Sequence, residues 1–232
     1  MLKGRPGTVK TVRRADAQTI MTKEERLEKQ KIRLDEMLQF ERELWASGKE
    51  FIAGVDEVGR GPLAGPVVTA AVILPHDFSL LGVDDSKKLS PKKRDELYDQ
   101  IKEAAVCWAI GRREPERIDE INILEATKEA MLDAIGALSV RPAHVLIDAV
   151  TLKGLQMPQT ALIKGDARSV SIAAASIIAK VTRDREMEAM AKIWPGYAFE
   201  SNKGYGTAAH YEGIKEFGPC PIHRKTFLGG YI

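Results

Sequence analysis

The most constraining feature of this chain is an apolar strand that runs directly into two adjacent acids and a glycine-rich loop. The run 51–56 predicts a strand, and Asp56 and Glu57 lie at its end, just before the loop Gly59-Arg60-Gly61. Side chains alternate between the two faces of a strand, so both acids can serve one site only where the strand ends or bulges. Paired carboxylates beside a basic glycine loop indicate metal chemistry on a phosphate.

Apolar runs and helix-capping residues predict an α/β fold for the rest of the chain. Two buried runs, at 51–56 and 67–74, flank the glycine loop and predict a β-hairpin. Further strands are expected at 106–111, 143–148 and 160–163, and helices at 91–104, 122–138, 169–194 and 207–217. Because the hairpin is followed by alternating helices and strands, we expect a central mixed β-sheet flanked by helices.

The chain of 232 residues is long enough for one domain with a substantial core and a short appendage. We expect a basic tail and a helical extension over 1–48, and a main domain over 49–232 whose part from about 195 is helical. The tail carries five cations and no acid before position 15, namely Lys3, Arg5, Lys10, Arg13 and Arg14. One long amphipathic helix from Thr22 to Ser47-Gly48 is either a nucleic-acid-binding appendage or a helix packed on the main domain.

Composition narrows the protein class without identifying a partner. The net charge of +2 is too small to indicate a nucleic-acid binder by itself. Cys107 and Cys220 are far apart and lack the spacing of a zinc site or a disulfide framework. No apolar run is long enough to span a bilayer. We therefore expect a cytoplasmic protein with no membrane partner.

Four acids share one context, because each follows a predicted strand. Asp56 and Glu57 follow the first strand, Asp148 ends the run 145–147, and Asp166 comes just after 160–163. Ligands of open α/β sheets bind beyond the carboxyl ends of strands. Converging carboxylates repel one another unless a hard divalent cation lies between them. The set predicts a Mg²⁺ or Mn²⁺ site and two-metal phosphodiester hydrolysis, although any one of these acids alone would suit a turn or cap role.

The glycine loop also fits the minimal dinucleotide pattern GxGxxA through Ala64, which would indicate a nucleotide-cofactor enzyme. A dinucleotide site requires a helix directly after the glycines, so that the helix N-terminus faces the pyrophosphate. Here Pro62 and Pro66 precede a β-branched run that predicts a strand. The loop is better interpreted as a turn whose main chain approaches a sugar-phosphate closely, or as a plain hairpin turn with a solvated Arg60.

Seven ordered motifs, which run from about Phe51 to Phe227, resemble bacterial ribonuclease HII. They are Gly54 to Pro66, Asp85-Ser86-Lys87-Lys88-Leu89-Ser90, Ile147-Asp148-Ala149, Lys164-Gly165-Asp166-Ala167, Ala173 to Val181 with Arg183-Asp184, Lys203-Gly204-Tyr205-Gly206-Thr207, and Pro221-Ile222-His223-Arg224. The resemblance implies an RNase H-like fold and an endonuclease that hydrolyses the RNA strand of RNA–DNA hybrids. It also implies incision at ribonucleotides embedded in duplex DNA, 3′-hydroxyl and 5′-phosphate products, and a monomer.

The resemblance further implies roles for single residues. Asp56, Glu57 and Asp148 would be metal ligands, and Asp166 would complete the acidic set. Asp184 competes for that fourth place, although an ion pair with Arg183 or Arg185 is expected for it instead.

Substrate recognition is implied for the glycine loop, for Tyr205 and for several cations. Gly59, Arg60 and Gly61 would contact the ribose 2′-hydroxyl and a phosphate, and Tyr205 would bind the same hydroxyl; its alternative is a loop tyrosine that covers the edge of the core. Phosphate contacts are expected from Lys87 and from further basic candidates, which are Lys88, Lys164, Lys180, Arg183, Lys203, Arg224 and Lys225. His223 and Arg224 would line the substrate groove. A non-catalytic hybrid-binding module is the alternative function, but the intact acids argue against it because they repel phosphate.

Overall fold

The computed structural model describes residues 21–229, so the predicted basic tail lies outside the described part of the chain. Five strands form one sheet in the order β3-β2-β1-β4-β5. Their bounds are β1 Ile52–Val58, β2 Val67–Ile73, β3 Cys107–Arg113, β4 His144–Asp148 and β5 Gln159–Leu162. β1 pairs antiparallel with β2 and parallel with β4, which confirms the predicted hairpin and the mixed sheet.

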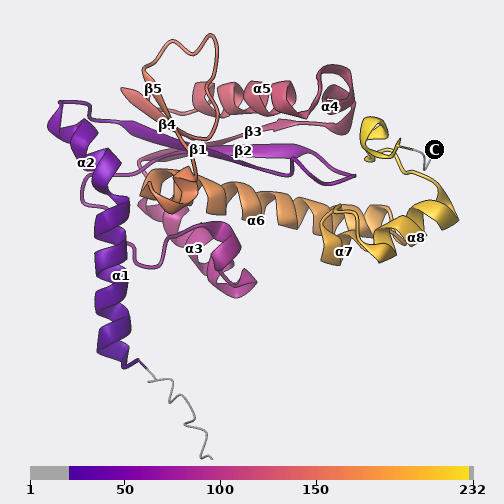
Figure 1. Ribbon diagram of the computed structural model, residues 1–232, viewed down its shortest axis with the longest axis horizontal. Coiled ribbons are helices and arrows are strands. Elements are labelled where there is room, and N and C mark those ends of the chain that lie inside the picture. Colours follow the sequence, from indigo (N-terminus) through magenta and orange to yellow (C-terminus); the bar gives the residue numbers. More distant parts are fainter. Residues whose placement is uncertain (1–20, 230–232) are drawn as a thin grey trace, which may run out of the picture.

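Helices cover both faces of the sheet (Figure 1). α5, Ile123–Gly136, packs on one face against β2 and β3, and α6, Val170–Ile193, packs on the other face against β1 and β2. α3, Pro91–Ala104, lies against α6 and begins as predicted, with Ser90 as N-cap and Pro91 at the first helical position. In the part of the chain that the structure describes, no helix is long and apolar enough to cross a membrane.

Two short helices were not predicted from the sequence. α4, Pro115–Ile121, and α7, Phe199–Asn202, have seven and four residues, which is too few to show a helical period. α8, Ala208–Phe217, ends at Gly218 as predicted. α4 had one usable signal, which is the proline at its first position.

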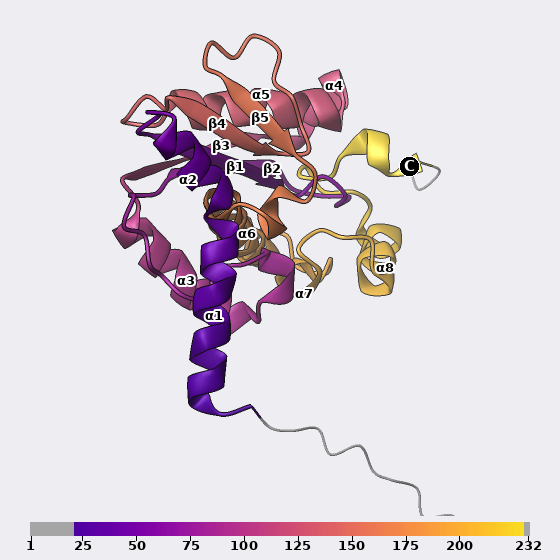
Figure 2. The same cartoon turned by 60° about the vertical axis from the view of Figure 1, so that its left-hand side comes forward.

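The single helix predicted for the N-terminal extension is in fact two helices. α1, Lys23–Met37, and α2, Gln39–Ala46, are separated at Leu38. The first turns of α1 are exposed and point away from the sheet, whereas α2 lies against it (Figure 2). Leu34, Met37 and Leu38 are buried in the core between α3 and α6. The break allows α2 to turn Phe40 and Leu44 toward a second cluster beside β4.

The contact between β1 and α6 is so close that it requires a glycine. A Cβ atom at Gly54 would lie 2.0 Å from the main-chain carbonyl carbon of Ser171. This approach brings the N-terminal end of α6 onto the strand that carries Asp56 and Glu57.

We predict that Gly54→Ala lowers the free energy of unfolding by about 2 kcal/mol or more, because the methyl group pushes α6 off β1. Gly136→Ala is the matched control, since no atom lies within 4 Å of a Cβ there. The control should leave stability unchanged or raise it by less than about 1 kcal/mol. Urea denaturation of the two variants measures the difference; equal stabilities would contradict the close-contact argument.

Candidate active site

Three of the four predicted acids meet at the carboxyl edge of β1, β4 and β5. Val55 pairs with Ile147 across the parallel ladder, so the next residues, Asp56 and Asp148, lie side by side. Asp166 lies in the 3₁₀ turn η2, Gly165–Ala167, which follows β5. The Gly165 N–H donates to Asp148 Oδ1 at 2.6 Å and ties the two segments together.

Glu57 occupies a different position from the one expected. β1 continues to Val58 instead of ending at Asp56, so alternation places Glu57 on the opposite face of the strand from Asp56. Its Oε1 atom lies 3.6 Å from Arg60 Nη1. Its Oε2 atom is buried and finds no hydrogen-bond partner among residues 21–229. The carboxylate therefore has an unused oxygen at the rim of the site.

Burial and repulsion from neighbouring acids raise the pKa values of Asp56, Glu57 and Asp166. Burial, followed by the charges of Glu57 and Asp148, raises the pKa of Asp56 well above its usual range. Burial is also the main cause that raises the pKa of Glu57, partly offset by Arg60. The pKa of Asp166 is raised by burial and by the charge of Asp85. Each ionised carboxylate thus destabilises the others, and a cation would relieve that repulsion.

The oxygen-only donor set fits a hard divalent cation. Within residues 21–229, however, no group of three or more acidic, histidine or cysteine side chains lies close enough to hold a metal ion as it stands. The carboxylates would therefore have to move closer together to hold a cation.

The buried side chain of Arg224 binds the main chain of the glycine loop. Its guanidinium donates to the carbonyl oxygens of Gly59 at 2.6 Å, Arg60 at 3.0 Å and Gly65 at 2.8 Å. The expectation that Arg224 lines the substrate groove is wrong, because the side chain is completely buried. Its charge is used to shape the loop main chain.

Arg183 has the same role on the other side of the loop. It is fully buried on α6 and donates to the carbonyls of Pro66, Ala64 and Lys203, at 2.8, 3.0 and 2.9 Å. A Cβ atom at Gly59, where φ is 92°, would lie 2.3 Å from Arg183 Nε. Gly59 is therefore required both by its backbone conformation and by the guanidinium beneath it. The expected phosphate contact of Arg183 is wrong for the same reason.

β2, not a helix, follows the glycine loop, which removes the dinucleotide interpretation. The loop faces Tyr205 instead. The Tyr205 ring is 42% exposed, and its Cε1 atom lies 3.7 Å from the position of a Cβ at Gly61. The Leu63 N–H donates to the Gly204 carbonyl at 2.8 Å, which joins the two loops. Arg60, Gly61 and Tyr205 are exposed near Asp56 and Glu57, whereas Gly59 is buried.

A buried pair of histidines, His210 and His223, contacts the main chain of Tyr205. His210 Nδ1 lies 2.9 Å from the Tyr205 carbonyl, and His210 Nε2 lies 3.0 Å from His223 Nε2. The Cys220 N–H donates to His223 Nδ1 at 2.9 Å. His223 is buried, so the expectation that it lines the groove is also wrong. No local sequence signal pairs these two histidines, because their contact depends on the path of the chain after α8.

Lys87, a predicted phosphate contact, reaches the acids and remains open to solvent. It lies in the 3₁₀ turn η1, Ser86–Lys88, which Asp85 caps by accepting from the Lys87 N–H. Its Nζ atom is 3.5 Å from Asp166 Oδ2, and its side chain is 80% exposed.

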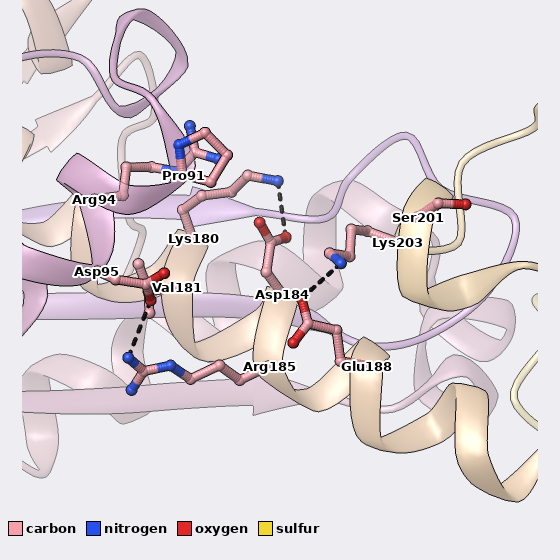
Figure 3. Close-up of a pocket in the computed structure, with 10 residues that line it drawn as sticks. All are labelled: Pro91, Arg94, Asp95, Lys180, Val181, Asp184, Arg185, Glu188, Ser201 and Lys203. Atoms are coloured by element: carbon pink, nitrogen blue, oxygen red, sulfur yellow. Dashed lines mark hydrogen bonds and ion pairs between the residues drawn. The ribbon is translucent and has the colours of Figure 1, made fainter.

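Asp184 lies away from the acids, in a groove between α3 and α6 (Figure 3). It accepts from Lys180 at 2.8 Å, so the expected ion pair exists but with a different partner from Arg183 or Arg185. Two other cations of the groove are also paired with acids, Arg185 with Asp95 at 3.0 Å and Lys203 with Glu188 at 2.8 Å. A third, Arg94, donates to the carbonyls of Ser86 and Leu89.

Comparison with known proteins identifies the family to which this sequence is similar. The family model for ribonuclease HII matches residues 53–229. A ribonuclease HII of Ligilactobacillus salivarius is 56% identical over 202 residues, which are 87% of this chain and 79% of that protein. A ribonuclease HII of Leuconostoc mesenteroides is 63% identical over 187 residues, which are 81% of this chain and 74% of the relative.

Solved structures confirm the expected RNase H-like fold. The ribonuclease H2 of Pyrococcus horikoshii superposes with a TM-score of 0.62 at 30% identity, covering 76% of this chain and 93% of that one. The RNase HII from Archaeoglobus fulgidus, solved as a complex with PCNA, gives a TM-score of 0.64 at 28% identity, covering 75% and 94%.

The histidine pair makes a pH-dependent contribution to stability. Burial lowers the pKa of His223 to about 4 and also lowers the pKa of His210, whereas an unfolded histidine titrates near 6.5. The unfolded chain therefore binds protons between pH 6.5 and 4 that the folded chain does not. Stability from the pair is complete above pH 6.5 and is lost as the pH falls toward 4.

We predict that between pH 7 and pH 5 the free energy of unfolding of His223→Gln changes by about 1–2 kcal/mol less than that of the parent protein. His76→Gln, a substitution of an exposed histidine, is the matched control and should follow the parent. Urea denaturation at the two pH values gives the comparison. An identical pH dependence for His223→Gln and His76→Gln would refute the assignment.

Proposed function

The chain belongs to the ribonuclease HII family of RNA–DNA hybrid ribonucleases, and we propose that it also incises duplex DNA at embedded ribonucleotides by two-metal-ion hydrolysis. The observation that carries this proposal is the joining of the acidic sheet edge and the glycine loop in one turn. Asp56 and Glu57 precede Gly59 by three and two residues, respectively. A group that reads the sugar is therefore placed beside the groups that act on its phosphate.

We assign Asp56, Glu57, Asp148 and Asp166 as the ligands of Mg²⁺ or Mn²⁺. Bound divalent ions supply activation of a water molecule and stabilisation of the leaving oxygen. Cleavage of the bond between phosphorus and O3′ gives the 3′-hydroxyl and 5′-phosphate ends. The Gly165 N–H fixes one oxygen of Asp148 and leaves the other for a ligand. Glu57 brings the unpartnered Oε2 atom.

Recognition of the ribose is assigned to the surface formed by the glycine loop and Tyr205. The carbonyls of Gly59 and Arg60 already accept from Arg224, so the loop amides and the Arg60 side chain remain to approach the sugar-phosphate. The exposed Tyr205 side chain would bind the 2′-hydroxyl, which is the group that separates RNA from DNA. Sequence-independent reading of this kind suits a nuclease that selects a sugar.

Phosphate positioning is assigned first to Lys87, which is exposed and adjacent to Asp166. Lys180 and Lys203 are already paired with carboxylates, so a phosphate would have to displace Asp184 or Glu188 before reaching them. A non-catalytic hybrid-binding module finds no support in this arrangement, because four acids in the site repel a phosphate unless a cation is bound.

We propose that the enzyme acts as a monomer in the cytoplasm. All four acids and both recognition loops come from one chain, which supports a monomer. Cys107 and Cys220 are free and buried, as expected in a reducing compartment.

We predict that Asp148→Asn slows incision of a duplex with one ribonucleotide by about 100-fold or more, because one carboxylate of the cation site is lost. Binding of the same duplex, measured by fluorescence anisotropy, should remain within about threefold, since Asp148 contacts the cation and not the sugar. EDTA should stop cutting by the parent protein, and Mg²⁺ or Mn²⁺ should restore it.

Asp184→Asn is the matched control, and it should cut at close to the parent rate because Asp184 pairs with Lys180 outside the acidic edge. Loss of cutting in Asp184→Asn together with full activity in Asp148→Asn would reverse the ligand assignment. A parent protein that leaves the duplex uncut with every metal would refute the incision proposal.

We also predict that Tyr205→Phe and Tyr205→Ala slow cutting at a single embedded ribonucleotide by about 10-fold or more, because the hydrogen bond to the 2′-hydroxyl is lost. Cutting of a long RNA–DNA hybrid should fall less, since neighbouring riboses offer alternative registers. Phe217→Ala, on an exposed ring of α8, is the control. Equal rates for Tyr205→Phe and the parent on both substrates would remove the hydroxyl from the recognition surface.

A further inference from the structure

Two polar side chains of the N-terminal extension touch the segment that carries Asp166. The extension, α1 and α2, lies before residue 53, where the match to the family model begins. Arg33 projects from α1 and Glu41 from α2, and both end on the stretch 167–171. The extension is therefore in contact with the segment that directly follows Asp166.

Arg33 joins two loops that flank Asp166. Its Nε and Nη2 atoms bind the two carboxylate oxygens of Asp84 at 3.0 and 3.1 Å, and Nη2 also donates to the Ala167 carbonyl at 2.8 Å. This two-pronged pairing fixes the guanidinium plane and thereby the position of the Ala167 carbonyl, one residue after Asp166.

Asp84 extends the same constraint to the other side of Asp166. Its Oδ1 atom accepts from the Asp85 N–H at 2.8 Å, and Asp85 in turn caps the turn η1 that places Lys87 at 3.5 Å from Asp166. Arg33 thus reaches Asp166 by two routes, one through the main chain of η2 and one through η1.

Glu41 holds the other end of the segment. It is completely buried, and its Oε1 atom accepts from Ser169 Oγ at 2.5 Å and from the Ser171 N–H at 3.0 Å. Ser169 is the N-cap of α6, and its Oγ atom also accepts from the Ile172 N–H. The buried carboxylate of Glu41 therefore ties α2 to the start of α6, which lies three residues after Asp166.

We propose that Arg33 and Glu41 are positioning residues, which hold the segment Gly165–Ser171 from both ends and so place the Asp166 carboxylate opposite Asp148. This role rests on the proposed function of Asp166. The direction of the contacts supports it, because both side chains turn toward the main domain. A helix that served only to bind nucleic acid would not need a buried carboxylate, that of Glu41, bonded to the start of α6.

The first test measures the segment itself, without metal or substrate. In hydrogen exchange, Arg33→Ala and Glu41→Ala should exchange the amides of residues 165–172 about 10-fold faster than the parent. Arg42→Ala is the matched control, since it removes an exposed pair with Asp35 on the same extension. Unchanged exchange at 165–172 in a folded Arg33→Ala protein would overturn the proposal. Arg33, which is only partly buried, keeps the test valid if Glu41→Ala fails to fold.

The second test separates positioning from substrate binding. Arg33→Ala should lower kcat on an RNA–DNA hybrid by about 10-fold or more, with KM and the Kd for hybrid changed less than about twofold. Arg33→Lys, which keeps the positive charge on a single donor nitrogen, should recover part of the rate, and Arg42→Ala should match the parent. A raised KM with an unchanged kcat would make α1 a nucleic-acid arm and would overturn the proposal.

A failure of this proposal can be distinguished from a failure of the proposed function. If Asp148→Asn leaves cutting unaffected, the site assignment fails, whereas the exchange result still reports whether Arg33 and Glu41 order the segment.

Discussion

The burial of two guanidinium groups against main-chain carbonyls is the constraint on which the proposed site depends. Arg183 and Arg224 are completely buried, and the partners that they bind are carbonyl oxygens of the loops that bear Gly59, Gly65 and Lys203. A buried charge is costly unless every donor is satisfied, so each carbonyl must remain within hydrogen-bond reach. The glycine loop, the loop before Tyr205 and the C-terminal segment are therefore fixed as one unit.

This unit lies directly beside a cluster of acids that works against stability. Burial and the charges of neighbouring acids raise the pKa of Asp56, which shows that its ionised form is disfavoured where it lies. Such a conflict between local stability and charge is typical of a functional site. The rigid loop supplies the compensating order, because a flexible loop would let Glu57 and its neighbours move apart. The residues proposed for recognition and for catalysis share one turn for this physical reason.

Sequence patterns predicted the parts of the fold that are long and periodic, and missed those that depend on distant contacts. The strands, α3, α5 and α6 follow from apolar periodicity and from signals such as Ser90-Pro91. The break at Leu38 was missed because both halves keep a helical pattern. Arg183 was expected to meet a phosphate, since an arginine on a charged helix usually faces solvent. Its acceptor at Pro66 is 117 positions away in the sequence.

Position in the sequence is likewise a poor guide to what the extension does. Composition draws a boundary near residue 48, yet Leu34 and Met37 are buried in the same cluster as Leu97 and Val83 of the main domain. Removing the extension would expose that cluster and would also delete Arg33 and Glu41. Truncation therefore mixes the loss of apolar packing with the loss of positioning. Only single polar substitutions separate the two, because they leave Leu34 and Met37 in place.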